Sequence, residues 1–237
     1  MHGAVQDHTA NEAFVAHLRD GTTAFSMDRR GRGASSDGVG SYSIEREFED
    51  VAAVADAVAA RTGGPVALWG HSYGANCAMG AAARTKNAGH LILYEPGLGM
   101  TYRAGSIEAV EEAVARGDTE GAARTLLVGI VEMTDEEFDA LRSSPVWPSR
   151  LATVPTVPRE LRGEADWVYR QGQFEAVTAS TLLLAGSESP PAQDGATRRA
   201  AAALPDARVR MLEGHGHLAH RTEPAMVATV VKEFIRR

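Results

Sequence analysis

The sequence predicts an α/β fold, in which a mostly parallel sheet is covered by helices on both faces. Apolar runs of strand length recur along the chain, at residues 22–27, 65–70, 90–94, 181–185 and 208–212. Helical patterns alternate with them, at residues 44–61, 75–84 and 223–237. Strands that alternate with helices are typical of crossover connections, which make neighbouring strands parallel.

Each of these elements has a boundary signal in the sequence. The first run ends at Asp28, and the third is stopped by Pro96-Gly97. Residues 44–61 carry apolar side chains at helical spacing, and residues 75–84 are rich in alanine, so this helix should pack closely. The last run follows the turn residues Pro205-Asp206. The final segment has the pattern of an amphipathic helix.

The region between the third and fourth runs does not follow this alternation. Residues 106–115, 119–131 and 134–142 read as successive helices, and four prolines between residues 145 and 158 indicate a looser stretch. We therefore expect a helical insertion at residues 101–176. Residues 1–100 and 177–237 would form the core into which it is inserted.

Composition restricts the classes of function. The chain has 237 residues, of which 44% are hydrophobic, and a net charge of −7, so nothing favours binding to nucleic acid or to an anionic membrane. Cys77 is the single cysteine and rules out an internal disulfide. No apolar run reaches the length of a membrane span, and the N-terminus lacks the features of a secretion signal. We expect a cytoplasmic enzyme acting on a small molecule; the oligomeric state is not predicted.

A pentapeptide at the end of the second run carries the main chemical signal, Gly70-His71-Ser72-Tyr73-Gly74. A nucleophilic serine on a strand-to-helix turn has a strained backbone, and residues two before and two after it must be small. The helix that follows directs its first N–H groups to the place where negative charge develops. The alternative is a glycine-rich turn with an ordinary N-cap serine.

Four motifs in a fixed order resemble the α/β-hydrolase family. His2-Gly3-Ala4 resembles its oxyanion loop, residues 28–35 its glycine-rich loop, residues 70–74 its nucleophile elbow, and residues 214–217 the loop of its catalytic histidine. The resemblance implies a serine hydrolase without a cofactor, with Ser72 as nucleophile and the helical insertion as a cap over the active site. The oxyanion hole would then use the backbone N–H groups of Tyr73 and Ala4.

A serine hydroxyl needs a neighbouring base to accept its proton. His217 lies in the Gly-rich loop before the last helix, where the family places this base, and His215 is the alternative in the same loop. These two histidines could also form half of a metal site, but no cluster of carboxylates or cysteines completes it, so no metal is expected. His71, Trp147 and Trp167 are weaker candidates for substrate contacts.

The acid that orients the histidine has two candidates. The position at which the family commonly carries the acid corresponds to Ser189, and a serine cannot act as that acid. Glu188 is the adjacent residue. Some family members instead take the acid from the end of the preceding strand, where this chain has Glu95. A carboxylate at the tip of a buried strand is explained only if it is paired, so Glu95 is favoured and Glu188 is the alternative.

The resemblance also implies missing strands. The family's His-Gly loop follows its third strand, yet only Met1 precedes His2 here, so the first three strands are expected to be absent from this chain. Either the natural protein starts further upstream, which we favour, or residues 22–27 and 65–70 pair directly. Loss of the third strand would leave a gap of roughly 9–10 Å between residues 22–27 and residues 65–70. We therefore expect a sheet of five strands in which residues 22–27 are poorly placed or re-paired.

Three functions agree with these observations. The first is hydrolysis of a carboxylic ester, lactone or thioester through an acyl-enzyme. The second is another serine-dependent reaction of the same fold, carbon–carbon bond hydrolysis or perhydrolysis. The third is a non-catalytic or truncated hydrolase-like binding protein. Arg29, Arg30 and Arg32 could suggest phosphate binding, but bracing of the 28–35 loop is the favoured interpretation.

Overall fold

A four-stranded parallel sheet forms the centre of residues 1–236, the part of the chain that the computed structural model describes. Its strands, in spatial as well as sequence order, are β1 Val66–His71, β2 Ala88–Tyr94, β3 Ser180–Gly186 and β4 Ala207–Leu212. All three strand pairs are parallel. The carboxyl ends of the strands therefore meet at one edge of the sheet, where ligands bind in open α/β sheets.

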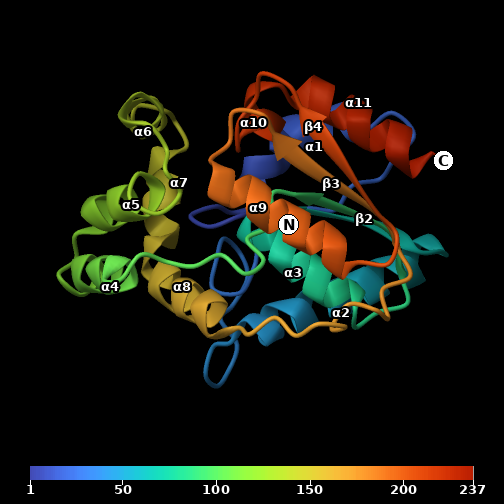
Figure 1. Ribbon diagram of the computed structural model, residues 1–237, viewed down its shortest axis with the longest axis horizontal. Helices are drawn as coiled ribbons and strands as arrows, with labels where there is room; N and C mark the ends of the chain where they lie inside the picture. The colour runs from blue at the N-terminus through green and yellow to red at the C-terminus, as the bar shows by residue number, and fades with distance from the viewer. Residues whose placement is uncertain (237) are drawn as a thin grey trace.

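Helices account for most of the remaining ordered chain (Figure 1). Around the sheet they are η1 His8–Asn11, α1 Glu12–Leu18, α2 Ile44–Thr62, α3 Tyr73–Ala82, α9 Pro191–Ala203, α10 Ala219–Thr222 and α11 Pro224–Ile235. Between β2 and β3 they are α4 Ser106–Ala115, α5 Thr119–Leu127, α6 Asp135–Arg142, α7 Trp147–Thr153, η2 Val154–Thr156 and α8 Val157–Asp166. None of these helices is both long and apolar enough to cross a bilayer.

The sheet separates two apolar cores. Leu91 and Leu93 of β2 pack with α3 and α9 on one face. Ile92 and Tyr94, the alternate residues of the same strand, pack with α1 and α11 on the other. This alternation follows from the period of two along a strand. Figure 1 shows the two helical layers above and below the strands, as the sequence predicts.

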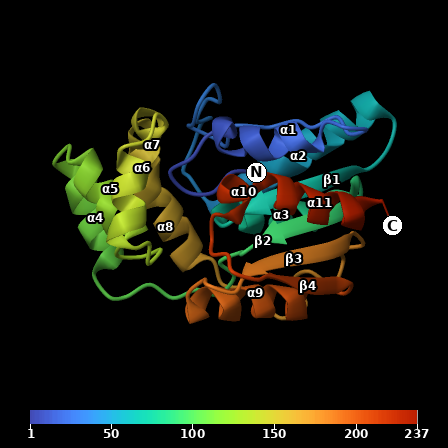
Figure 2. The ribbon, with the colours of Figure 1, turned by 90° about the horizontal axis from the view of Figure 1, so that it is seen from above.

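The helices from α4 to α8 (residues 106–166) lie within the predicted helical insertion at residues 101–176 and pack around a third apolar core of their own. Figure 2 shows them grouped to one side of the sheet and its covering helices. Val5, from the N-terminal loop, is buried in the same cluster. The predicted helices at 106–115, 119–131 and 134–142 correspond to α4, α5 and α6, with small differences at their ends.

Two expectations about secondary structure were wrong. Residues 22–27 form no strand, so the described chain has four strands rather than five. The edge of β1 next to the nucleophile turn is occupied instead by Met1, whose N–H donates to Trp69 and whose carbonyl accepts from His71. Without a partner strand, residues 22–27 run along the surface, and Phe25 is half exposed.

The proline-containing stretch is helical rather than loose. Pro148 lies in the first turn of α7, Pro155 in that of η2 and Pro158 in that of α8. Proline is tolerated there because the first N–H groups of a helix have no intrahelical acceptor. Each of these prolines lies at the start of a helix. Several prolines close together in a sequence are equally compatible with helix starts and with a loop.

Candidate active site

The turn from β1 to α3 holds Ser72 in a backbone conformation that few side chains adopt. Its φ is 55° and its ψ is −126°, and its N–H donates to the carbonyl of Tyr94 over 2.9 Å. A Cβ atom on Gly70 would lie 2.4 Å from the carbonyl oxygen of Gly74, and one on Gly74 would lie 2.4 Å from that of His2. Close backbone approach therefore requires glycine at both positions.

The N-terminal loop lies directly against this turn. A Cβ atom on Gly3 would come within 3.2 Å of the Ser72 Cβ atom. Ala4 and Tyr73 line the same cavity as Ser72. Tyr73 is the first residue of α3, so its N–H has no acceptor within the helix. The structure thus brings both predicted oxyanion-hole residues to the serine.

Glu95 and His217 meet although 122 residues separate them in sequence. The Nδ1 atom of His217 lies 2.5 Å from Oε2 of Glu95, and the other carboxylate oxygen accepts from the N–H of Gly186 over 2.7 Å. Glu95 is fully buried. Because the carboxylate accepts at Nδ1, the imidazole carries its proton there and leaves Nε2 as an acceptor.

The alternative residues lie elsewhere. Glu188 is exposed, and its recorded contact is a backbone bond from its N–H to the carbonyl of His215. His215 lies outside the cavity that Ser72 and His217 line. Ser189, at the common family position of the acid, has a buried hydroxyl without a hydrogen-bond partner among the described residues. The structure therefore brings Glu95, and not Glu188, to the histidine.

Two residues anchor the loop of His217: Tyr94, which sequence reasoning did not single out, and His71, which it considered only for substrate contacts. The hydroxyl of Tyr94 donates to the carbonyl of Gly216 and accepts from the N–H of Ala219. His71 donates from Nε2 to the carbonyl of His217 over 2.9 Å. Burial, reinforced by neighbouring His220, holds the pKa of His71 well below its usual range, so this ring is neutral.

The three weaker substrate-contact candidates do not line the cavity, contrary to expectation. His71 is buried behind His217, with ring centroids 4.5 Å apart. Trp147 packs edge-on against Phe138 inside the helical insertion. Trp167 packs against Phe48 of α2. Trp147 and Trp167 thus add their apolar area to packed clusters rather than to the cavity wall.

A cavity of about 300 Å³ contains Ser72 and His217. Its apolar wall comes from the linker after β2 and from the helical insertion, with Met100, Leu126 and Leu161 among its side chains. No Ser72–His217 hydrogen bond is present in residues 1–236; catalytic hydrogen bonds are often long or poorly aligned without substrate. A cavity of this size and character accommodates a small organic molecule.

Comparison with known proteins agrees with this geometry. A family model described as the alpha/beta hydrolase family matches residues 1–230. The chain belongs to the alpha/beta hydrolase family. No curated protein matches it.

Solved structures resemble this alpha/beta hydrolase along its length. An alpha/beta hydrolase from Sphaerobacter thermophilus is 26% identical, with a TM-score of 0.84 over 99% of this chain and 90% of that one. A hydrolase from Oleispira antarctica is 17% identical, with a TM-score of 0.77 over 100% and 89%. A thermophilic esterase from Thermogutta terrifontis is 22% identical, with a TM-score of 0.72 over 99% and 87%. The last two show the fold alone.

A buried ion-pair network joins the hydrolase core to the helical insertion. Arg29 pairs with Glu47 of α2 over 2.9 Å and with Glu160 of α8 over 3.1 Å, and Arg32 pairs with Glu160 as well. The four side chains are at most 2% exposed. The arginines of the 28–35 loop therefore act as braces, and nearby Arg30 pairs with Asp50.

Proposed function

We propose that this alpha/beta hydrolase is a serine hydrolase that cleaves a carboxylic ester, lactone or thioester of a small molecule. The observation that carries the proposal is the contact of buried Glu95 with His217 at the cavity that Ser72 lines. A buried carboxylate costs several kcal/mol unless it is paired. Its pairing with a histidine beside a strained serine matches the arrangement that activates a hydroxyl nucleophile.

In this proposal His217 accepts the Ser72 proton at Nε2 while the serine Oγ attacks the carbonyl carbon. The Tyr73 and Ala4 N–H groups donate to the oxyanion that forms. Protonated His217, stabilised by Glu95, returns the proton to the departing alcohol or thiol. Water then attacks the acyl-enzyme, His217 takes its proton, and the acid leaves as the Ser72 hydroxyl is restored.

We further propose that the helical insertion is the cap of this site. Supporting this role, α5 and α8 contribute side chains to the cavity wall, and the linker from β2 to α4 contributes Met100 and Tyr102. Substrate selection would then depend on the insertion, while bond cleavage depends on residues at the ends of the strands. The core would comprise residues 1–100 and 177–237.

A fluorophosphonate probe tests the proposal at the nucleophile. Intact-mass and peptide analysis should find one adduct, at Ser72, and p-nitrophenyl acetate should be hydrolysed. Ser72→Ala should lose the adduct and at least about 10³-fold in rate. Ser143→Ala, at an exposed serine of the insertion, is the matched control and should behave as wild type. Equal turnover by wild type and Ser72→Ala would exclude the mechanism and favour a binding protein.

A further inference from the structure

Glu164 of α8 is a second carboxylate in the cavity that the mechanism does not use. It lines the same cavity as Ser72 and His217. Its Oε1 atom accepts from Nδ2 of Asn76 over 2.5 Å, and its Oε2 atom accepts from the hydroxyl of Tyr102. Glu164 is partly buried, and its carboxylate reaches from α8 to Asn76 of α3.

The contacts that hold this carboxylate are made by neutral groups. The salt bridges among the described residues include none to Glu164, and both of its hydrogen-bond donors are neutral. Glu160, one turn earlier in α8, differs because Arg29 and Arg32 both pair with it. An unpaired carboxylate in a largely apolar cavity carries a desolvation cost that a cationic ligand would remove.

Glu164 lies within the reach of a short substrate from the nucleophile. Its partner Asn76 is four residues after Ser72 in α3, one helical turn or roughly 6 Å along the axis. A Cβ atom on Gly97, two residues after Glu95, would lie 2.7 Å from Oε1 of Glu164. The carboxylate is therefore next to the segments that carry the nucleophile and the acid.

The ionisation of Glu164 reflects this environment. Burial raises its pKa to about 7, nearby Glu160 contributes to the rise, and the Tyr102 and Asn76 hydrogen bonds oppose it. Arg29 also lowers the pKa of Glu164, by less than either hydrogen bond does. The group is thus largely ionised in the alkaline range and ready to bind a cation there.

We propose that Glu164 is a recognition site for a protonated amine on the substrate, which makes this hydrolase selective for small esters, lactones or thioesters that carry an ammonium group. The substrate class rests on the proposed function; ammonium binding itself does not. The ammonium would donate to the carboxylate lone pairs that face the cavity, while the scissile carbonyl lies at Ser72. The apolar wall, including Met100 and Leu161, would cover the carbon chain between them.

A purely structural role would not need a charge. Glutamine at position 164 could accept from Tyr102 and could donate to Oδ1 of Asn76, which is buried without a partner. For this bond the Asn76 amide would rotate, so that Oδ1 takes the place that Nδ2 has beside Glu164. A neutral amide would therefore join α8 to α3 at a lower desolvation cost. What the carboxylate adds is its negative charge, which is the property that an ammonium ligand requires.

The first test measures binding without turnover. Calorimetry at about pH 8.5, above the Glu164 pKa, compares n-pentylammonium with pentan-1-ol, which has the same chain and no charge. The wild type should bind the ammonium roughly tenfold more tightly, as a charge-assisted contact requires. Glu164→Gln should remove this preference and leave pentanol binding unchanged. Glu132→Gln, at an exposed carboxylate of the same cavity, should retain it.

The preference should also weaken at about pH 5, where Glu164 is protonated. The charged or titratable groups near it are Glu160, Arg29 and Tyr102, together with the cavity residues Tyr73, Arg103, Glu132 and His217, so Glu164→Gln at the same pH serves as the reference. An ammonium preference that is absent from the wild type, or equal in wild type and Glu164→Gln, would overturn the proposal. These results do not depend on whether Ser72 is a nucleophile.

The second test joins recognition to turnover. Ethyl 5-aminopentanoate and ethyl hexanoate differ only in ammonium against methyl, and acid release gives kcat/KM for each. The ratio in favour of the amine should be about ten in wild type and near one in Glu164→Gln. Cleavage of both esters with a ratio unaffected by Glu164→Gln would overturn amine selectivity and leave the hydrolase proposal intact. Cleavage of neither ester, with ammonium binding retained, would instead count against the proposed function.

Discussion

Glu95 and Ser72 share an uncommon backbone state at the carboxyl edge of the sheet. Their φ angles are 48° and 55°, a region that costs a non-glycine residue about 1–3 kcal/mol. At Glu95 both backbone groups are held, since its N–H donates to Leu184 and its carbonyl accepts from the Gln193 amide. This fixed backbone aims the carboxylate at His217. Such departures from ordinary backbone preferences are expected at functional sites.

Glu95→Gln should lower kcat by about 10³- to 10⁴-fold, because an amide cannot stabilise the imidazolium or select the required tautomer. The substitution conserves shape and leaves an acceptor for the Gly186 N–H, so folding should be retained. Steady-state kinetics and circular dichroism measure the two effects. Glu188→Gln is the control and should turn over as wild type; a larger loss in that variant would reassign the acid.

Gly74→Ala tests the close approach at the elbow. The added methyl would lie 2.4 Å from the His2 carbonyl oxygen, so the N-terminal loop must shift, at a cost of about 1–3 kcal/mol. Chemical denaturation should show this loss of stability, together with reduced activity. Gly64→Ala is the matched control, because nothing lies within 4 Å of its added Cβ atom. Equal stability of the two variants would contradict the packing described.

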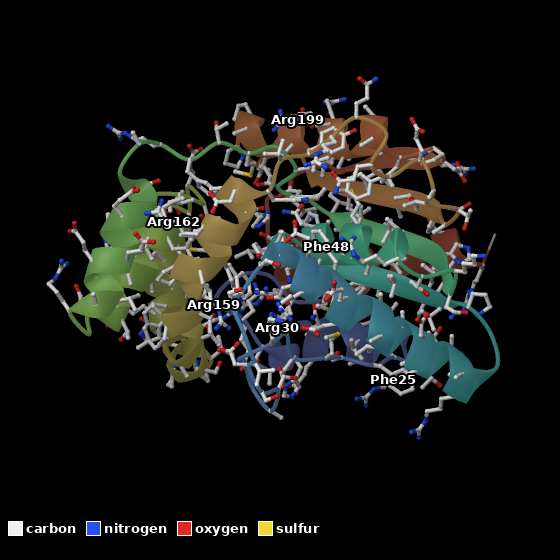
Figure 3. All side chains as sticks on the ribbon, turned by 90° about the horizontal axis from the view of Figure 1, so that it is seen from below. Phe25, Arg30, Phe48, Arg159, Arg162 and Arg199 are labelled. Carbon is white, nitrogen blue, oxygen red and sulfur yellow. The ribbon has the colours of Figure 1, made fainter. Side chains whose placement is uncertain are left out.

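At the scale of elements, ion pairs of different burial attach α8 to the N-terminal loops. Glu160 binds Arg29 and Arg32 out of contact with water, whereas Arg159 binds Asp37 at the surface, where their side chains are 27% and 52% exposed. Figure 3 shows Arg159 beside Arg30 at the junction of the insertion and the core, and Arg159 also contacts the Arg30 carbonyl. One helix thus holds the insertion in place and supplies Glu164 to the cavity.

These two kinds of pair should respond differently to mutation. Glu160→Gln removes a negative charge from between two buried guanidinium groups and should cost about 3–5 kcal/mol in the free energy of unfolding. Asp37→Asn should cost less than about 1 kcal/mol, because solvent screens the pair. Urea titrations of both variants measure the difference. A Glu160→Gln loss no larger than that of Asp37→Asn would argue against a bracing role for the network.

The whole molecule places a cavity between a rigid sheet edge and a helical insertion with its own core. Two separate apolar clusters cover the sheet faces and a third fills the insertion, and buried ion pairs join the two parts. Glu164 lies at that meeting point, and its ionisation therefore couples the cavity to the stability of the folded chain.

Glu164 should make the protein less stable as pH rises. Its pKa is about 7 in the folded state, against 4.5 for a carboxyl exposed to water, so between these pH values the native state holds a proton that the unfolded state has lost. The contribution of Glu164 to the free energy of unfolding is fully present below about pH 4.5 and is lost as the pH rises through about 7. This contribution is at most about 3 kcal/mol.

Glu164→Gln isolates this contribution, because all other titrations occur in both proteins. The melting temperature of the variant relative to wild type should rise between about pH 5 and pH 8, by several degrees at the upper end. A relative melting temperature that does not change over this interval would show that Glu164 keeps an ordinary pKa. The carboxylate would then carry no desolvation cost for a cationic ligand to remove.

Sequence patterns predicted the elements whose signals are local. The helix beginning at Ile44 and the strand ending at Tyr94 have the predicted identity, because periodicity and turn residues act over a few positions. Residues 22–27 have the same apolar character as a strand, yet a strand exists only through its partner, and β1 offers Met1 instead. A local sequence pattern does not determine which segment will be the hydrogen-bonding partner of a strand.

By itself, the sequence determined the α/β class and the order of the motifs, and it required glycine on either side of Ser72. These depend on backbone geometry within a turn or on the alternation of strands and helices. Only the tertiary structure decided that Glu95 rather than Glu188 reaches His217, and that Glu164 lines the cavity with no salt-bridge partner among the described residues. Both depend on contacts between segments about a hundred residues apart in the chain, and a side chain's environment exists only once the distant segments have packed.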